Sequence, residues 1–186
     1  MFGVSYHGFG SCGFIGGGNM AQAIITGLLK SGRSSSDILV SDPNRDCRKA
    51  LAKMGITSFA DSTPVMAQAH LVVLAVKPQI MDSVLTNLVD SLKATHVIIS
   101  IAAGITIQNI RHRLNDAQNP VVRVMPNTPA LIGEGMSALV SDQLLNEDIK
   151  TAVQEIFDTC GHALWVPNEQ AIDAVTAVSG SGPAYF

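Results

Sequence analysis

The sequence predicts an α/β protein with a mostly parallel sheet that carries helices on both faces. Short apolar runs alternate with longer segments in which apolar residues recur at helical spacing. Several of the runs, such as "LVVLAV" at 71–76, are apolar throughout rather than at alternate positions. Strands of this kind, each followed by a helix, form parallel sheets with both faces buried. A composition of 47% hydrophobic and only 15% charged residues fits such a doubly covered sheet.

The elements follow one another in regular alternation along the chain. Strands are predicted at Gly13–Gly16, Asp37–Ser41, Ile56–Ala60, Leu71–Val76, His96–Ser100, Val121–Met125, Met136–Val140 and His162–Val166. Helices are predicted at Met20–Lys30, Arg45–Met54, Pro64–Ala69, Ile80–Leu92, Ile107–Leu114 and Glu147–Cys160. Capping signals support several helices: Thr63 precedes a proline at a first helical position, Asn146 precedes Glu147, and Gly161 follows Cys160 as a stop.

A further helix is predicted after the last strand. Pro167 and Asn168 start it, and apolar side chains recur at helical spacing over Glu169–Val178. We interpret this helix as a bridge that leaves the sheet domain. The predicted boundaries are therefore a dinucleotide-type sheet domain at 12–166 and a connecting segment at 167–186.

Composition excludes several classes of function. A net charge of −3 provides no basic surface for nucleic acid, and no apolar run is long enough to span a membrane. The three cysteines contain no CxxC pair, and the five histidines show no metal-ligand spacing. We therefore expect no metal, no disulfide framework and a reducing compartment. The start of the chain lacks a signal-peptide pattern, so the expected localisation is cytoplasmic.

The sharpest motif is "GFIGGGNMA" at Gly13–Ala21. It follows a predicted strand and opens a predicted helix, which is the context that a dinucleotide fingerprint requires. Gly16 permits the tight turn, Gly18 lets the backbone approach a pyrophosphate, and Ala21 is small enough for close packing of helix and strand. The helix N-terminus offers free N–H groups to the phosphates. The motif predicts a Rossmann-like fold.

The end of the second strand, "VSDPNRD" at Val40–Asp46, bears on which dinucleotide is bound. Asp42 is placed to accept the ribose hydroxyls of NAD. Alternatively, Ser41, Asn44 and Arg45 surround the 2′-phosphate of NADP, with Arg45 as the charged donor. A third interpretation is that Asp42 only caps the next helix. The residues leave these alternatives open.

Three further loops follow predicted strands. They are "AVKP" at Ala75–Pro78, "SIAAGIT" at Ser100–Thr106 and "RVMPNTP" at Arg123–Pro129. Open α/β sheets bind ligands at the carboxyl ends of their strands, so these loops are candidates to line the same site.

Taken together, the motifs GFIGGGNMA, LAVKP, SIAAGIT, RVMPNTP, EGMSALV and AVSGSGPAYF, in this order, closely resemble the pyrroline-5-carboxylate reductase family. The resemblance runs from Gly13 to Phe186. It implies reduction of the C=N bond of 1-pyrroline-5-carboxylate to L-proline, the last step of proline biosynthesis, with NADPH or alternatively NADH. Family members pair this domain with an all-helical C-terminal domain that dimerises, so the resemblance implies a homodimer or larger homo-oligomer for the full-length form.

The resemblance also implies roles for individual residues. The pyrophosphate would be held by Ile15, Gly16, Gly17, Gly18, Asn19 and Met20. The cofactor would further be lined by Ala75, Val76, Lys77, Pro78, Ile101, Ala102 and Ala103. Ser41 would lie near the adenosine 2′ position, Asn127 near the nicotinamide and Glu134 at the substrate. Ser62 stands where many members carry an asparagine near the adenosine. No residue emerges as a catalytic proton donor.

In the family, SGSGPAY opens the first long helix of the C-terminal domain, and this chain ends at Phe186. We therefore expect the start of a truncated helical domain, and a chain that binds cofactor but is poorly active. Its last segment is expected to have few native partners, with Ile172, Val175, Val178, Tyr185 and Phe186 exposed or covered only by the sheet domain or a second copy. The alternatives are a related NADP-dependent imine reductase or β-hydroxyacid dehydrogenase, or a dinucleotide-binding module without catalysis.

Overall fold

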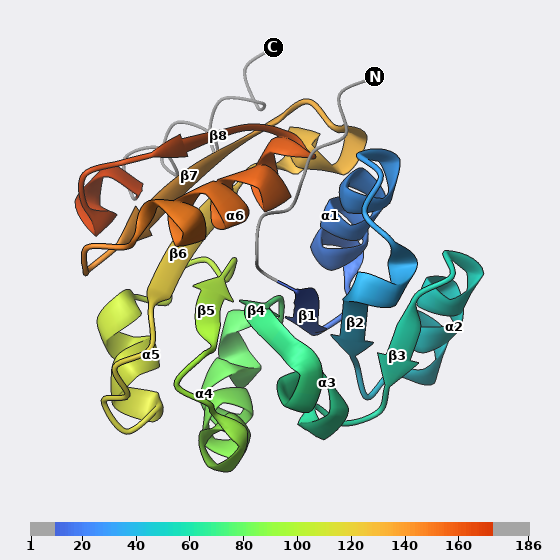
Figure 1. Cartoon of the computed structure of the whole chain (residues 1–186), viewed down its shortest axis with the longest axis horizontal. Helices are drawn as coiled ribbons and strands as arrows, with labels where there is room; N and C mark the ends of the chain where they lie inside the picture. Colours follow the sequence, from blue (N-terminus) through green and yellow to red (C-terminus); the bar gives the residue numbers. More distant parts are fainter. Residues whose placement is uncertain (1–9, 173–186) are drawn as a thin grey trace.

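A computed structural model of the chain describes residues 10–172. These residues form a sheet of eight strands in the order β3-β2-β1-β4-β5-β6-β7-β8 (Figure 1). The strands are β1 (Ser11–Ile15), β2 (Ile38–Ser41), β3 (Thr57–Phe59), β4 (Ala69–Leu74), β5 (Val97–Ser100), β6 (Val121–Pro126), β7 (Gly135–Ser141) and β8 (Gly161–Trp165). Each of the predicted strands is present, with ends that shift by a few residues.

The α-helices are α1 (Asn19–Lys30), α2 (Arg45–Lys53), α3 (Thr63–Gln68), α4 (Pro78–Leu88), α5 (Ile107–Arg113) and α6 (Glu147–Asp158). Short 3₁₀ helices are η1 (Ser35–Asp37), η2 (Val89–Ser91) and η3 (Thr128–Ile132). The largest difference from prediction is at α4. It begins at Pro78 rather than Ile80, because proline is favoured at a first helical position, and it ends in η2 rather than continuing to Leu92.

The chain changes direction once within the described sheet. The strands pair in parallel except β6 and β7, which are antiparallel with Val124 opposite Leu139. Only η3 and a short turn connect these two strands, and an antiparallel pair needs no crossover helix. The prediction of a mostly parallel sheet is confirmed.

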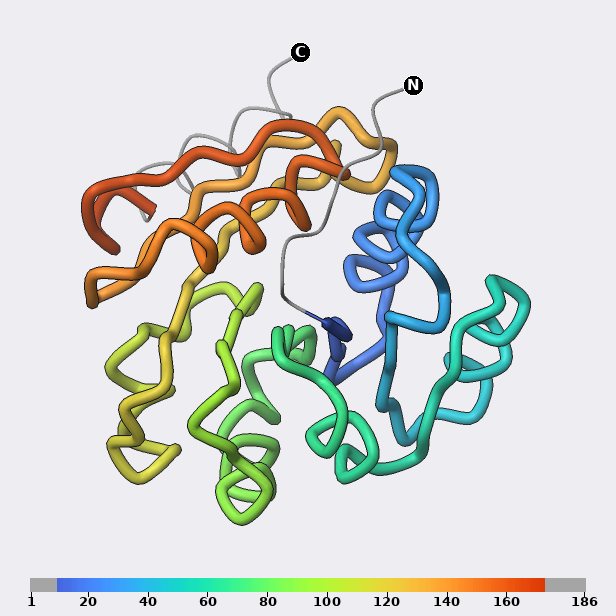
Figure 2. Tube along the Cα trace, in the orientation of Figure 1, coloured from blue at the N-terminus to red at the C-terminus, as the bar shows by residue number. Residues whose placement is uncertain are grey.

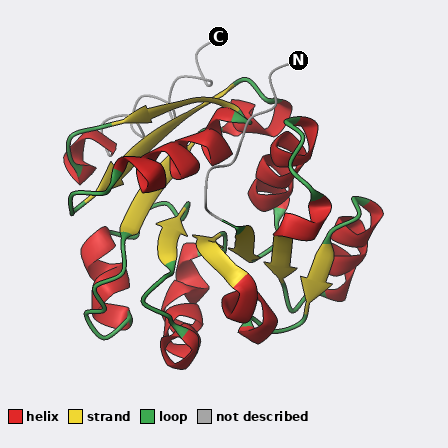
Figure 3. Ribbon diagram, in the orientation of Figure 1, coloured by secondary structure: helices red, strands yellow, loops and turns green. Residues whose placement is uncertain are grey.

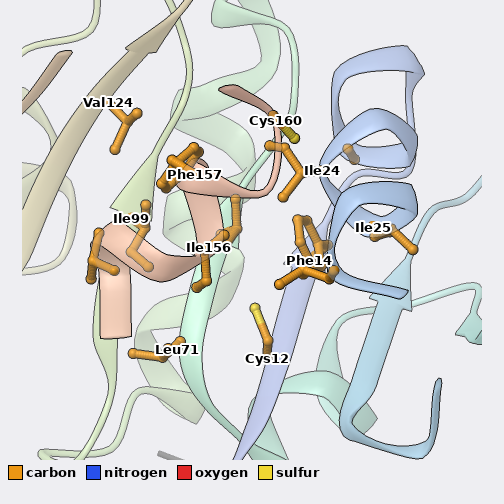
Figure 4. Packing of buried hydrophobic residues seen from close by; sticks show 14 of the residues in the cluster. Cys12, Phe14, Ile24, Ile25, Leu71, Ile99, Val124, Ile156, Phe157 and Cys160 are labelled. Atoms are coloured by element: carbon orange, nitrogen blue, oxygen red, sulfur yellow. The ribbon is translucent and has the colours of Figure 1, made fainter. Parts of the chain in front are cut away.

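Helices cover both faces of the sheet, as Figure 3 shows with helices in red. On one face, α1, α2 and α6 enclose a cluster that includes Phe14, Ile24 and Phe157, each at most 1% exposed (Figure 4). On the other face, α3, α4 and α5 enclose a second cluster that includes Met81 and Ile110. The chain trace in Figure 2 shows β1 and β4 between these layers. This double burial is the physical reason for the apolar composition.

One buried polar side chain makes the stability of the fold depend on pH. His96 is fully buried; its Nδ1 accepts a hydrogen bond from the Lys93 N–H at 3.0 Å, and its Nε2 lies 3.0 Å from the Met66 carbonyl oxygen. Since Nδ1 accepts, Nε2 carries the proton and donates to that carbonyl. Burial, more than the nearby Lys93 and His70 charges, lowers the pKa of His96 from its ordinary 6.5.

We expect the free energy of unfolding to fall as the pH drops below about 6.5. Below that pH His96 binds a proton in the unfolded chain but stays neutral in the folded protein, because its pKa is lower there. The contribution is fully present above the unfolded pKa and is lost at up to about 1.4 kcal/mol per pH unit below it. Urea unfolding at about pH 7.5 and about pH 5.5 measures it. His96→Gln should show a smaller difference between the two; an unchanged difference would contradict this role.

An ion pair connects α5 to the end of β7. Arg111 donates from Nε and Nη2 to the Asp142 carboxylate at 2.6 and 2.8 Å, and from Nη1 to the carbonyl oxygens of Ala117 and Asn119. The hydrogen bonds from Arg111 to the carboxylate hold the pKa of Asp142 below its usual range. The ion pair therefore fixes the carboxyl end of α5 and the loop that leads into β6.

The start of the segment after β8 packs against the sheet. Glu169 accepts hydrogen bonds from Ile107 and Arg123, and Ile172 is fully buried beside the second cluster. Burial of Ile172 against the sheet domain is one of the outcomes expected for it. The expectation of few partners is wrong for Glu169, whose carboxylate accepts two hydrogen bonds from the sheet domain. Val175, Val178, Tyr185 and Phe186 lie outside the described residues, and the domain boundary at 166 remains a prediction.

Candidate dinucleotide-binding site

The turn between β1 and α1 is held against two neighbouring strands. Gly16 has φ +98°, and a Cβ there would lie 2.5 Å from the Ala75 carbonyl oxygen. The Gly16 N–H donates to the Ser41 carbonyl oxygen at 2.7 Å, and the Ala75 N–H donates to the Ile15 carbonyl oxygen at 2.8 Å. The ends of β1, β2 and β4 are thus joined, and only glycine fits at position 16.

The next glycines of the turn differ in their surroundings. A Cβ on Gly17 would lie 2.8 Å from Leu51 Cδ1 and 2.9 Å from Cys47 Sγ, so this glycine packs on α2. Gly18, the N-cap of α1, is exposed and has no atom within 4 Å of its Cβ position. The first turn of α1 contains no acidic residue. A phosphate can approach this helix N-terminus closely, because no side chain covers Gly18 and no acidic residue in the first turn repels it.

The carbonyl oxygen of Gly17 is also held from α1 and α2. It accepts a hydrogen bond from Gln22 Nε2 at 2.7 Å and one from Cys47 Sγ at 2.8 Å. Burial, together with the nearby Asp42 carboxylate, raises the pKa of the Cys47 thiol. Cys47 therefore stays protonated as a donor to the turn.

Asp42 holds the glycine turn from the end of β2. Its Oδ2 accepts from the Gly17 N–H at 2.9 Å, and its Oδ1 accepts from the Asn44 N–H at 2.8 Å. The cap of α2 is Asn44, whose Oδ1 accepts from Asp46 and Cys47. The interpretation of Asp42 as the helix cap is therefore wrong: an asparagine two residues later takes that position.

A cavity of about 590 Å³ opens at the carboxyl ends of β1 to β4. This is where the strand order reverses, with β1 between β2 and β4. The predicted residues that line it are Ile15, Gly16, Gly18, Ser41, Asp42, Ser62, Ala75, Val76 and Lys77. The structure thus brings together the residues expected around the adenosine and phosphates.

Other lining residues were missed by the sequence analysis. They are Pro43, Ala60, Asp61, Thr63, Ile80, Val84 and Asn87. The last three lie at i, i+4 and i+7 on α4, so they share one helix face. That spacing was a signal in principle, but an amphipathic helix shows the same pattern without a ligand.

The remaining predicted residues lie outside this lining. Gly17, Asn19, Met20 and Pro78 belong to the turn and to the helix starts beside the cavity. Arg45 is exposed at the first residue of α2. Arg48, which the sequence analysis did not single out, donates from Nη1 to the carbonyl oxygens of Asp42 and Pro43 at 2.7 and 2.8 Å. Arg48 therefore stabilises the turn that forms the cavity edge.

The loop after β5 that is expected to line the cofactor, and the residues expected near the nicotinamide and the substrate, lie farther along the sheet. The Ile101 N–H donates to the Leu74 carbonyl oxygen at 3.2 Å, Ala102 is buried and Ala103 is exposed. Asn127 accepts a hydrogen bond from the Met136 N–H through its Oδ1 at 2.9 Å. Glu134 is exposed after Gly133, which has φ +83°. These residues follow β5 and β6 in the order that a cofactor lying across the strand ends would meet them.

The strand order, the glycine turn and the cavity at the strand reversal define the class: this is a Rossmann-like NADP oxidoreductase fold. Within this class, the chain belongs to the family described as "NADP oxidoreductase coenzyme F420-dependent", whose model matches residues 11–104, half of the chain.

The individual relatives and solved structures that match the chain are pyrroline-5-carboxylate reductases. The chain is 43% identical to the pyrroline-5-carboxylate reductase of Haemophilus influenzae, over 93% of this chain and 64% of that protein. It is 42% identical to that of Pseudomonas aeruginosa, over 93% and 63%. Among solved structures, the Coxiella burnetii pyrroline-5-carboxylate reductase is 35% identical, with a TM-score of 0.89 over 96% of this chain and 66% of that one. The resemblance inferred from the motifs is confirmed.

The Plasmodium falciparum pyrroline carboxylate reductase, solved with NADP bound, is 31% identical, with a TM-score of 0.81 over 94% of this chain and 64% of that one. The chain thus spans less than two thirds of the length of the curated relatives quoted above.

Across residues 10–172, no helix combines the length and apolar character needed to cross a bilayer. Within the same range, no group of histidine, cysteine and acidic side chains is arranged to hold a metal ion.

Proposed function

We propose that this chain carries the NADP-binding part of a pyrroline-5-carboxylate reductase, which reduces the C=N bond of 1-pyrroline-5-carboxylate to L-proline. The observation that carries the proposal is the open Gly18 at the N-terminus of α1, on the edge of a cavity lined by the ends of β1, β2 and β4. The substrate is inferred from the relatives, which are pyrroline-5-carboxylate reductases, and the NADP bound to the Plasmodium falciparum structure supports the choice of cofactor.

The residues present fit a dinucleotide. The α1 N-terminus would bind the pyrophosphate, because its first N–H groups lack intrahelical partners and no side chain covers Gly18. Ser41 and Ser62 line the cavity where the adenosine would lie, and Lys77 adds a positive charge. When bound, the nicotinamide supplies the hydride.

The proposed reaction does not require a strong general acid or base in this part of the protein. A protonated imine is already electrophilic, so the main requirement is that its carbon lies against the nicotinamide at reactive distance. Glu134 is proposed at the substrate side, where an exposed carboxylate would attract a cationic iminium. Absorbance assays on a form of the protein as long as its relatives test the substrate class. NADPH oxidation in the presence of pyrroline-5-carboxylate is compared with NADP⁺ reduction in the presence of a 3-hydroxy acid. Turnover of the hydroxy acid alone would contradict the proposal.

The proposed 2′-phosphate contact yields a direct test of cofactor preference. We expect Arg45→Ala to weaken NADPH binding roughly fivefold relative to NADH, because an exposed arginine contributes modestly to a phosphate contact. Fluorescence titration with both cofactors measures the ratio. Lys53→Ala removes an exposed charge from the other end of α2 and is the matched control. If Arg45→Ala and Lys53→Ala give the same ratio of NADPH affinity to NADH affinity, Arg45 has no role at the 2′-phosphate.

A further inference from the structure

The carboxylate of Glu169 joins three parts of the chain that are far apart in sequence. Glu169 lies after β8, and its Oε1 accepts a hydrogen bond from Arg123 Nη1 of β6 at 2.9 Å. The same oxygen accepts from the backbone N–H of Ile107, the first residue of α5, at 3.1 Å. One carboxylate oxygen therefore links the segment after β8 to both β6 and α5.

The burial of Arg123 makes this link hard to replace. The Arg123 side chain is 4% exposed, whereas that of Glu169 is 29% exposed. A guanidinium removed from water needs a carboxylate close by to offset its lost hydration. Arg123 lies opposite Ser100, the last residue of β5, in the parallel register of the sheet. The ion pair therefore holds Glu169 beside the end of β5.

The loop between β5 and α5 is anchored at its two ends. At its start, the Ile101 N–H donates to the Leu74 carbonyl oxygen and the Ala102 N–H donates to Ser100 Oγ at 3.3 Å. At its end, the N–H of Ile107 donates to Glu169. Between these anchors, Ala103 and Gly104 are exposed. At the far end of the loop, Thr106 Oγ1 accepts from the Asn109 N–H at 3.1 Å, whereas the acceptor for the Ile107 N–H comes from outside the loop, 62 residues along the chain.

We propose that Glu169 is a positioning residue for the nicotinamide end of the cofactor site. By holding the Ile107 N–H, it fixes the carboxyl end of the loop 101–106, whose residues Ile101–Ala103 are proposed to line the cofactor. The position of the segment after β8 and the shape of that loop are thereby coupled. This inference rests on the proposed dinucleotide function, because it assigns a wall of the same site.

The coupling predicts a difference between two ligands. NADPH contacts the whole site, whereas 2′-phospho-ADP-ribose lacks the nicotinamide and contacts only the adenosine and phosphate end. We expect Glu169→Ala to weaken NADPH binding at least about fivefold while changing binding of the fragment less than about twofold. A residue that only stabilised the fold would weaken both ligands equally.

Companion variants keep the test decisive if Glu169→Ala folds poorly. Glu169→Asp retains the charge but shortens the side chain by one methylene, so it should also weaken NADPH selectively. Glu169→Gln retains an acceptor oxygen at the same reach and should restore part of the selective loss. The matched control is Asp142→Ala, which breaks the Arg111 ion pair at the other end of α5 and should leave the ratio of the two affinities unchanged.

Titration calorimetry with both ligands on the 186-residue chain gives these affinities. Equal losses for NADPH and the fragment, no loss for either, or a selective loss in Asp142→Ala as well would each overturn the positioning role. Failure of the unmutated chain to bind either ligand would instead contradict the proposed function.

Discussion

Replacing Gly18 with valine is expected to weaken NADPH binding at least about 100-fold, a loss of roughly 3 kcal/mol. The added side chain would occupy the space at the α1 N-terminus that the pyrophosphate needs. The fold should survive, because no protein atom lies within 4 Å of the Cβ position and the backbone, at φ −67° and ψ −175°, is extended. Valine at an N-cap costs about 1 kcal/mol of stability at most.

Fluorescence titration with NADPH and thermal unfolding of the same samples measure the two effects. Gly18→Ala adds only the Cβ and should give a smaller loss of affinity. Unchanged NADPH affinity in a folded Gly18→Val protein would show that the glycine turn does not hold the cofactor.

Replacing Gly161 with alanine is expected to reduce stability by about 3 kcal/mol or more. Gly161 has φ +138°, and its Cβ would lie 1.9 Å from the Gly135 carbonyl oxygen. That oxygen belongs to the backbone of the neighbouring strand β7, which is held there by the hydrogen bond from the Gly135 N–H to the Cys160 carbonyl oxygen. The clash can therefore be relieved only by separating β7 from β8.

Gly32→Ala is the control for the backbone conformation alone. Gly32 has φ +97° but no atom within 4 Å of its Cβ position, so alanine should cost only about 1 kcal/mol there. Urea unfolding compares the two variants. Equal losses would show that conformation rather than the close approach of β7 makes glycine necessary at 161.

The alternation of elements was predictable from sequence because the strands β1, β2, β4, β5 and β6 are buried on both faces. A run such as Leu71–Leu74 reads as a strand without knowledge of its neighbours, since its whole length is apolar. The glycine turn was predictable for a related reason: Gly16 and Gly18 are required by local geometry and by a ligand close to the backbone. Both signals lie within a few residues.

Features that depend on distant residues were less accessible. The choice between Asp42 and Asn44 as the cap of α2 depends on Gly17, whose N–H draws the Asp42 carboxylate toward the turn. The link from Glu169 to Ile107 and Arg123 joins three separate segments, and no local pattern indicates it. Gly161 was predicted as a helix stop, but α6 ends at Asp158 with Thr159 as its C-cap. Glycine is required at 161 by the close approach of Gly135, which appears only in the folded sheet.

The lining of the site shows the same division. Ser41 and Lys77, which end or follow strands, were predictable because the carboxyl ends of parallel strands meet at one edge, whereas Ser62 was indicated only by the resemblance to the family. Ile80, Val84 and Asn87 were not predictable, since they face the cavity only because the opposite face of α4 packs into the second cluster.

A dinucleotide is proposed to lie across the strand ends, from the glycine turn to the loop after β5. Backbone amide shifts of the 19.6 kDa chain on titration with NADPH test it most directly. We expect saturable changes at Gly16–Gly18, Ser41, Ser62 and Ala75–Lys77, continuing to Ile101–Ala103. Changes confined to the hollow beside Trp165 and Lys150, or no saturable change, would contradict the account.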